Sequence, residues 1–334
     1  MKLCGIATAG IRIKSKLRWL AALCLVLAIP VSLLVACTPI SEEPAPPDEE
    51  MPAFSLEVTD QAGRVVRIEK MPEKIISLAP SNTEIVFALG LEGELVGVTE
   101  YCDYPEAAKD KLKIGGFSTV DIEKVVEIQP DLILAVNIHK KEVIPELERL
   151  GLTVVCLDPT TLEKVLEAIT LIGQCTDAED EASRLVAEMR NRIEAITSKT
   201  ANLTEAQKPR VFVIMWHDPL NSTGPGLRHD IIVKAGGINI VGELLSEAYP
   251  TVTLEWVIDT NPEVIIAGVG MGTGEDLTFQ FALNEERLAG VDARIHNRVY
   301  QIDLDLFGRP GPRIVQGLEQ VAKMIHPAIF GEVE

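Results

Sequence analysis

The chain has 334 residues, a length that accommodates two domains of ordinary size. Hydrophobic residues make up 47% of it, so a sizeable buried core is expected, whereas aromatic residues contribute only 4%, so each ring is a useful marker. The formal net charge of −19 excludes the usual kind of nucleic-acid surface, because such a surface needs clustered lysine and arginine to meet phosphates.

The N-terminus has the pattern of a secretory signal peptide. Basic residues between Lys2 and Arg18 precede an apolar run at residues 20–36, which ends as LVAC at Cys37. Small residues before a cysteine resemble a bacterial lipobox, in which the cysteine is lipidated when the signal is cleaved. We therefore predict a signal peptide at residues 1–36 and lipidation of Cys37, with the mature protein outside the cell membrane. The alternative is an uncleaved transmembrane anchor, because the run approaches the shortest length that spans a bilayer.

Residues 37–53 are rich in proline and glutamate and cannot bury enough apolar surface to fold. They predict a disordered tether between the lipid and the first domain.

Three cysteines remain beyond the signal and the lipid site, namely Cys102, Cys156 and Cys175. None lies in a CxxC pair, so the spacing predicts no zinc site. One disulfide at most can form among them, and the sequence does not say whether it does.

The first folded elements are a hairpin and a strand that leads into a helix. Residues 54–68 alternate as two strands around a turn at residues 61–63, and IISLA at residues 75–79 predicts a strand buried on both faces. After Pro80, the polar residues SNTE at 81–84 predict N-cap side chains for a helix that ends at Gly90. Since α/β proteins bind ligands where strands lead into helices, we predict that the SNT segment faces a ligand.

The chain contains an internal repeat. Residues 122–135 read IEKVVEIQPDLILA and residues 254–267 read LEWVIDTNPEVIIA, each predicting a short helix, a proline stop and a buried strand. A second match joins EIVFALG at residues 84–90 with DIIVKAG at residues 230–236. The repeat predicts two similar α/β lobes, each with a mostly parallel sheet flanked by helices.

A long amphipathic helix is predicted between the two repeats. In residues 176–202, apolar residues recur at three- and four-residue steps. We therefore expect an N-terminal lobe at residues 54–175, a connecting helix within residues 176–207 and a C-terminal lobe at residues 208–334. An ordinary surface helix of one domain is the alternative.

These motifs occur together in one order along the chain. They are the lipobox, the hairpin, IISLAPSNTEIVFALGLEGELVGVTEYCDYPEAAK, IGGFSTVDIEKVVEIQPDLILA, the long helix and DLFGRPGPRI. In this order they resemble the substrate-binding lipoproteins of ABC importers, in the single-helix-backbone class that captures cobalamin, ferric siderophores or haem. The resemblance covers residues 54–329. It implies two lobes joined by one long helix, a ligand cleft between them, and delivery to a dimeric ABC permease with its ATPase.

Within that class, YCDYPEAAK and GGFSTVDIEKVV are most similar to the cobalamin-binding proteins, which implies cobalamin or a related corrinoid as the transported ligand. The family's ligand positions fall on Tyr101, Phe117, Tyr249, Asp305, Leu306, Phe307, Gly308 and Arg309. We add Trp216, which follows the predicted strand VFVIM. A corrin ring needs flat apolar faces and a few polar groups for its amide rim, which these residue types supply.

The sequence departs from the cobalamin-binding pattern in two ways. Phe117 and Tyr249 stand where some of those proteins have tryptophan, and Cys102 stands where serine is common. A ferric siderophore is therefore the alternative ligand, with haem less favoured because Gly116 replaces the axial tyrosine of haem-binding relatives. The resemblance also implies that Glu123 and Glu255, at equivalent positions of the repeat, dock on the permease.

Other chemistry is not indicated by the sequence. The histidines are scattered, and His217 beside Trp216 could approach a bound metal or be an ordinary loop residue, so no metal site is predicted. The sequence has no Gly-x-Ser-x-Gly, P-loop or Cys/His nucleophile pair, and the glycine run at residues 268–274 does not match GxGxxG. We predict no enzyme activity and no enzyme cofactor, with a cell-surface enzyme as the remote alternative.

Overall fold

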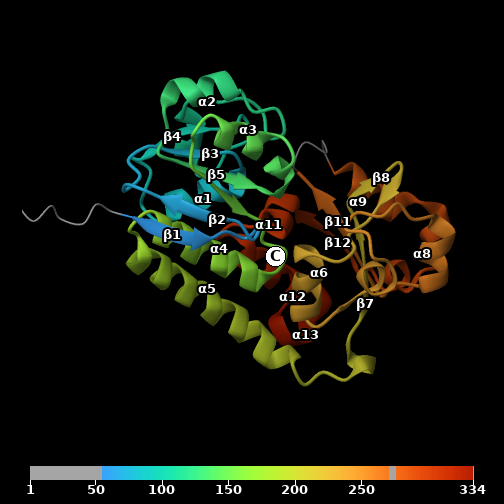
Figure 1. Ribbon diagram of the computed structural model, residues 1–334. Coiled ribbons are helices and arrows are strands. Elements are labelled where there is room, and N and C mark those ends of the chain that lie inside the picture. Colours follow the sequence, from blue (N-terminus) through green and yellow to red (C-terminus); the bar gives the residue numbers. More distant parts are fainter. Residues whose placement is uncertain (1–54, 271–275, 334) are drawn as a thin grey trace, which may run out of the picture. The chain divides into compact units, whose positions relative to one another are not determined.

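A computed structural model describes residues 55–270 and 276–333, which belong to one compact unit, Met51–Glu334 (Figure 1). The predicted signal peptide, Cys37 and the tether lie outside the described residues. The strands are β1 (Leu56–Thr59), β2 (Val65–Ile68), β3 (Ile75–Ser77), β4 (Leu95–Val98), β5 (Leu132–Val136), β6 (Val154–Leu157), β7 (Arg210–Ile214), β8 (Trp216–His217), β9 (Leu220–Asn221), β10 (Ile238–Asn239), β11 (Val264–Val269) and β12 (Val299–Asp303).

The α-helices are α1 (Pro80–Ala88), α2 (Ile122–Ile128), α3 (Val143–Arg149), α4 (Leu162–Cys175), α5 (Glu179–Thr200), α6 (Leu227–Lys234), α7 (Ile240–Leu244), α8 (Leu254–Thr260), α9 (Leu277–Asn284), α10 (Asp292–Ile295), α11 (Leu304–Gly308), α12 (Ile314–Ile325) and α13 (Pro327–Phe330). Within the described residues, no helix combines the length and the apolar character needed to cross a bilayer.

The predicted hairpin is confirmed. β1 and β2 pair antiparallel, with Leu56 opposite Ile68. The turn between them contains Gly63 at a φ of 78°, a left-handed conformation that glycine adopts without steric cost.

The N-terminal half, residues 55–175, is built on a parallel sheet of order β4-β3-β5-β6. Successive side chains of β5 point to opposite faces of this sheet. Leu132 and Leu134 enter a core shared with α4 and α5, whereas Ile133 and Ala135 enter an outer core covered by α2 and α3. Because both faces are buried, the strand reads as a continuous apolar run.

The C-terminal half, residues 208–333, has a parallel sheet of order β10-β7-β11-β12. This is the order of the first sheet once β3 is matched with β7 and β5 with β11, so the repeat read from the sequence is confirmed as two equivalent sheets. Each repeated helix ends on a left-handed residue before its proline, Gln129 at a φ of 52° and Asn261 at 42°. These caps turn the chain directly into β5 and β11.

The two halves share one hydrophobic core, and the long helix contributes to it. α5 follows the N-terminal half and buries Ala182, Met189 and Ile196 among residues of α4, α6 and α12. Arg192 of α5 forms a bidentate ion pair with Glu319 of α12, with both N–O distances 2.8 Å. The fold is therefore α/β, with two similar parallel-sheet halves and one long backbone helix, as the sequence predicts.

The prediction that residues 81–84 cap a helix is wrong. α1 begins at Pro80, whose missing N–H suits the first helical position, and its N-cap residue Ala79 has no polar side chain with which to cap the helix. Ser81, Asn82 and Thr83 lie inside the helix and are buried, so they do not face a ligand. The Asn82 amide instead donates to the carbonyl groups of Leu134 and Ala135, which fixes α1 against β5.

Cys102, Cys156 and Cys175 are buried free thiols, so they form no disulfide with one another. Burial raises the pKa of Cys156 to about 11 and that of Cys175 to about 12. Both thiols therefore stay protonated at neutral pH and behave as small apolar side chains.

Candidate ligand-binding site

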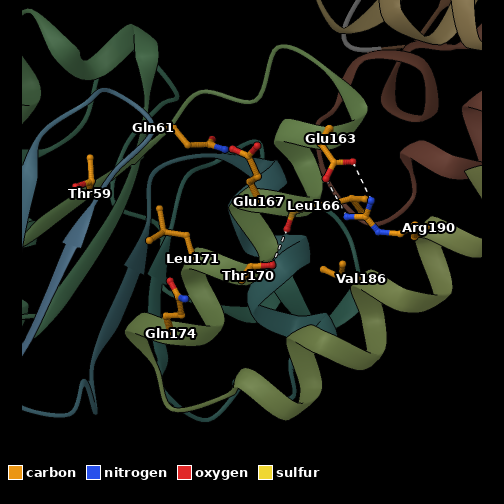
Figure 2. A pocket seen from close by; sticks show the side chains of 10 residues that line it. All are labelled: Thr59, Gln61, Glu163, Leu166, Glu167, Thr170, Leu171, Gln174, Val186 and Arg190. Atoms are coloured by element: carbon orange, nitrogen blue, oxygen red, sulfur yellow. Dashed lines mark hydrogen bonds and ion pairs between the residues drawn. The ribbon is translucent and has the colours of Figure 1, made fainter.

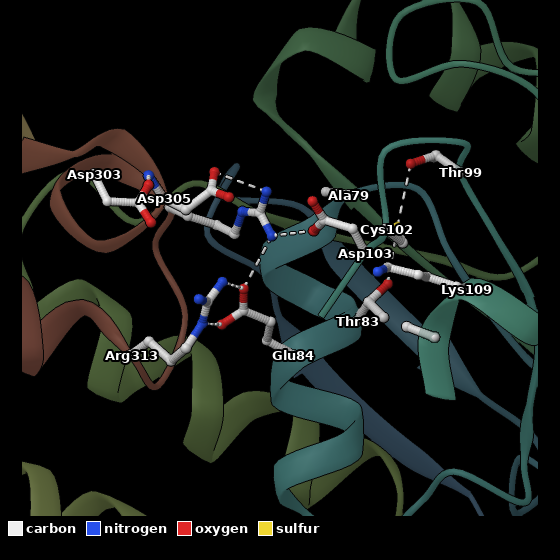
Figure 3. Close-up of polar contacts among 12 residues, drawn as sticks. Ala79, Thr83, Glu84, Thr99, Cys102, Asp103, Lys109, Asp303, Asp305 and Arg313 are labelled. Atoms are coloured by element: carbon white, nitrogen blue, oxygen red, sulfur yellow. Dashed lines mark hydrogen bonds and ion pairs between the residues drawn. The ribbon is translucent and has the colours of Figure 1, made fainter. Parts of the chain in front are cut away.

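Five charged side chains from both halves meet in one ion-paired cluster, which we call the junction cluster: Glu84, Asp103, Asp305, Arg309 and Arg313 (Figure 3). Arg309 donates to Asp103 and Asp305 at 2.8 Å each and to Glu84 at 3.2 Å. Arg313 holds Glu84 with two hydrogen bonds of 2.6 and 3.0 Å. The cluster thereby joins α1 and the loop after β4 to α11 and the turn before α12.

The surroundings of this cluster set the charge state of its members. Burial alone would lower the pKa of Arg309, but its hydrogen bond to Asp103 and the nearby carboxylates outweigh burial and raise that pKa. The hydrogen bond to Glu84 raises the pKa of Arg313. Burial raises the pKa of Asp305, although Arg309 opposes it. Both arginines therefore remain charged at every physiological pH, and they hold the two halves together through carboxylates.

The loop after β4 carries two tyrosines beside the junction cluster. Tyr101 is 61% exposed and Tyr104 is 45% exposed. The guanidinium of Arg313 lies 3.8 Å from the centre of the Tyr104 ring, a cation–π contact that anchors Tyr104 to the cluster. Tyr101 lies on the same loop, two residues from Asp103, and is free to present its ring to a ligand.

Phe117 follows Gly116, and the sequence did not identify the residue that positions it. The Nε2–H of His139 donates to the carbonyl of Phe117 at 2.7 Å, and the two rings meet edge to face at 5.7 Å. His139 is buried, and burial lowers its pKa, so the imidazole is neutral at pH 7. A side chain at position 116 would approach the Tyr101 ring, which places Tyr101 and Phe117 in neighbouring loops.

In the C-terminal half, Tyr249 and Trp216 are the accessible predicted rings. Tyr249 is 64% exposed, and its hydroxyl lies 3.5 Å from a guanidinium nitrogen of Arg228. Trp216 is half-buried and donates its indole N–H to the carbonyl of Asp218 at 2.7 Å. Its ring contacts His217, which in turn contacts Phe281. Trp216 is therefore the edge of an aromatic stack as well as a candidate ligand contact.

The stretch Asp305 to Arg309 divides between surface and core. Phe307 is fully buried in the shared core, so its predicted contact with a ligand is wrong: as an apolar residue of α11 it faces α12 and α6. Asp305 and Leu306 are half-buried, and Arg309 is 9% exposed and committed to the junction cluster. Gly308 leaves room for Arg228, because any side chain there would collide with that guanidinium.

Sequence reasoning missed Glu84, Asp103, Arg313 and Arg228. Glu84 was visible as a charged residue inside the apolar helix EIVFALG, a position that demands a partner once buried. Its arginine partners lie more than 220 positions away, as the separation of 225 residues to Arg309 shows, and no local pattern reveals such a pair.

The structure contains a hollow of about 280 Å³ elsewhere, between β1, α4 and α5 (Figure 2). Its walls include Gln61, Leu166 and Val186, and the ion pair of Arg190 with Glu163 borders it. Among the described residues, no aromatic side chain and none of the predicted ligand residues lines it. The hollow is therefore a poor match for a flat ligand that binds against aromatic rings, such as a corrin. In the part of the chain that the structure describes, no three His, Cys, Asp or Glu side chains are grouped as they would be for a metal ion.

The fold and the junction between its halves define a two-lobed α/β substrate-binding class, and comparisons with known proteins agree. The periplasmic binding protein family model matches residues 75–306. An uncharacterized ABC transporter substrate-binding lipoprotein of Bacillus subtilis is 30% identical over 90% of this chain and 95% of its own length. The chain therefore belongs to the periplasmic binding protein family, which consists of substrate-binding transport proteins.

Two solved structures show the same fold. A protein described as a possible iron-binding periplasmic solute-binding protein from Staphylococcus epidermidis is 27% identical, with a TM-score of 0.66 over 77% of this chain and 100% of its own. The periplasmic vitamin B12 binding protein of Vibrio cholerae is 26% identical, also with a TM-score of 0.66, over 77% of this chain and 98% of its own.

Proposed function

We propose that the protein captures cobalamin between its two halves and delivers it to a dimeric ABC permease that works with an ATPase. The observation that carries this proposal is the pair of exposed tyrosines, Tyr101 and Tyr249, one on each half, each linked to the junction between them. Tyr101 lies two residues from Asp103 of the junction cluster, and Tyr249 contacts Arg228, which packs against Gly308. Similarity to the vitamin B12 binding protein of Vibrio cholerae supports the same ligand.

A corrin suits this arrangement for physical reasons. Its flat face buries aromatic rings, each of which carries roughly 150–250 Å² of surface, and its amide rim needs a few hydrogen-bonding groups. Asp305 and Arg309, which pair with each other in the junction cluster, carry such groups. The ligand contacts that we propose are Tyr101, Phe117, Trp216, Tyr249, Asp305, Leu306, Gly308 and Arg309; Phe307 supports them from the core.

The identity of the ligand can be tested by its visible absorption. Purified protein mixed with cyanocobalamin and passed through a desalting column should retain the corrin absorption in a one-to-one ratio. The ferric-siderophore alternative, favoured by the similarity to the possible iron-binding protein of Staphylococcus epidermidis, predicts retained siderophore absorption and none from cobalamin. Recovery of the ligand chemically unchanged is expected of a carrier, whereas its conversion to a product would support the alternative of a cell-surface enzyme.

Removing single rings should weaken binding without unfolding the protein. Phe117→Ala and Tyr249→Ala should each raise the dissociation constant for cobalamin at least about tenfold, because a lost ring forfeits buried area and stacking. Phe330→Ala, in α13 and in contact with Lys199, removes an equal ring outside the proposed site and should leave affinity unchanged. Calorimetric titration measures all three. Wild-type affinity in both site variants would mean that the ligand binds elsewhere.

We further propose that the mature protein is held outside the cell membrane by lipid on Cys37. The LVAC motif and the family support this, as does the description of the Bacillus subtilis relative as a lipoprotein. Cys37→Ala should release the protein from the membrane fraction or leave an uncleaved precursor, as judged by fractionation and intact mass. A processed variant that still sediments with membranes would contradict the anchor.

A further inference from the structure

Arg228, in the first turn of α6, is a buried cation without an anionic partner among residues 55–270 and 276–333. The residue is 8% exposed, and its Nε is buried with no hydrogen-bond acceptor. Among the described residues its one hydrogen-bond partner is the Tyr249 hydroxyl, at 3.5 Å, the outer limit for such a bond. No described carboxylate lies within ion-pair distance of it.

The carboxylate nearest to Arg228 on its own helix, and the one closest in sequence to its neighbour Gly308 on α11, are already engaged. Asp230, on the same helix, accepts from the backbone N–H of Leu162 and pairs with Lys234. Asp305 pairs with Arg309. Burial lowers the pKa of Arg228, and Tyr249 is the group that opposes this effect. An arginine stays protonated even so, and therefore the charge is present and no carboxylate of the described residues compensates it.

The surrounding residues hold the guanidinium in place. Its Cζ lies 5.9 Å from the centre of the Tyr249 ring and 6.0 Å from that of Phe307, so it is held near two aromatic rings. Position 308 must be glycine for the guanidinium to lie there. A buried, unpaired charge destabilises a protein, and such a group is retained where it acts on a ligand. The exposed ring of Tyr249 marks the side from which a ligand can reach it.

We propose that Arg228 binds an anionic oxygen group of the ligand, with Tyr249 beside it. The proposal rests on the proposed function for the identity of that group: in cobalamin it is the phosphodiester of the nucleotide loop. The guanidinium offers Nε and the terminal nitrogens as a fork that matches two oxygens of a phosphate. An amide carbonyl of the corrin rim would leave the charge uncompensated, so the phosphodiester is the better partner.

The test compares cyanocobalamin with dicyanocobinamide, a corrinoid that lacks the nucleotide loop and its phosphate. Arg228→Gln should weaken binding of cyanocobalamin about tenfold or more, because a charge-assisted hydrogen bond is lost, and should change binding of cobinamide by less than about threefold. Arg184→Gln removes the same charge from the exposed face of α5, where Arg184 pairs with Glu181, and should alter neither affinity. An equal loss for both corrinoids, or none for cyanocobalamin, overturns the proposal.

A failure of the proposed ligand can be told apart from a failure of the anion subsite. If the wild-type protein binds neither corrinoid, cobalamin is the wrong ligand, and inorganic phosphate then tests the subsite. Phosphate at matched ionic strength should raise the melting temperature of the wild type and not that of Arg228→Gln. An equal shift in both proteins rules out an anion at Arg228, whatever the ligand.

Discussion

Replacing both Glu123 and Glu255 with arginine is expected to abolish ligand uptake while ligand affinity and melting temperature stay near wild type. Each glutamate is the second residue of its helix, α2 or α8, and each is exposed. The N-caps of these helices are Asp121 and Thr253, whose side chains accept from the backbone N–H groups three residues on. The two glutamates are therefore not needed as caps, and their removal costs the helices only a few tenths of a kcal/mol through the helix dipole.

The loss of uptake follows if each carboxylate meets arginine on one half of the permease, which is our proposal for these two residues. Breaking a desolvated interfacial ion pair costs about 2–5 kcal/mol, and charge reversal adds repulsion at both contacts. Transport of labelled cobalamin into cells that carry the cognate permease measures the effect.

The chain offers a matched control on the same two helices. Glu127 and Asp259 are exposed and lie one turn after Glu123 and Glu255. Their double change to arginine makes the same change in net charge and should leave uptake near the wild-type rate. If both double variants transport equally well, Glu123 and Glu255 do not dock the permease.

The architecture could be predicted because it follows from local sequence patterns. The repeat at residues 122–135 and 254–267 predicts a helix, a proline that ends it and a buried strand in each half. The two sheets have the same strand order. Hydrophobic periodicity placed the helix that the structure describes as Glu179–Thr200. The interactions that form these elements are between residues close together in the sequence, so one sequence is enough to predict them.

The candidate site was predictable only in part. Tyr101 and Tyr249 are exposed rings and stay predicted ligand contacts, but Phe307 is core and the polar residues after Pro80 are buried inside α1. Whether an aromatic ring faces solvent or core depends on the helices packed over it. The buried charges are harder still to predict. The partners of Glu84 come from distant segments of the chain, and Arg228 is explained by a ligand.

Glu84→Gln should be among the most destabilising single changes in the protein. The carboxylate is 3% exposed and accepts three hydrogen bonds, two from Arg313 and one from Arg309. Glutamine keeps the size of the side chain but leaves two guanidinium groups close together with less negative charge between them. Breaking a buried ion pair from one side costs about 3–5 kcal/mol of the free energy of unfolding. Thermal melting should show a fall of about 10 °C.

Glu163→Gln is the matched control for this change. Glu163 also holds an arginine, Arg190, through both of its oxygens, but the two side chains are 55% and 47% exposed. An exposed pair of this kind contributes about 0–1 kcal/mol, so the control should melt within a few degrees of the wild type. Equal losses in the two variants would show that Glu84 is not the centre of the junction cluster. A larger loss in Glu84→Gln, partly recovered when Arg313→Gln is added, would show that the cost is the unpaired charge of Arg313. Among the described residues Arg313 pairs only with Glu84, whereas Arg309 keeps Asp103 and Asp305.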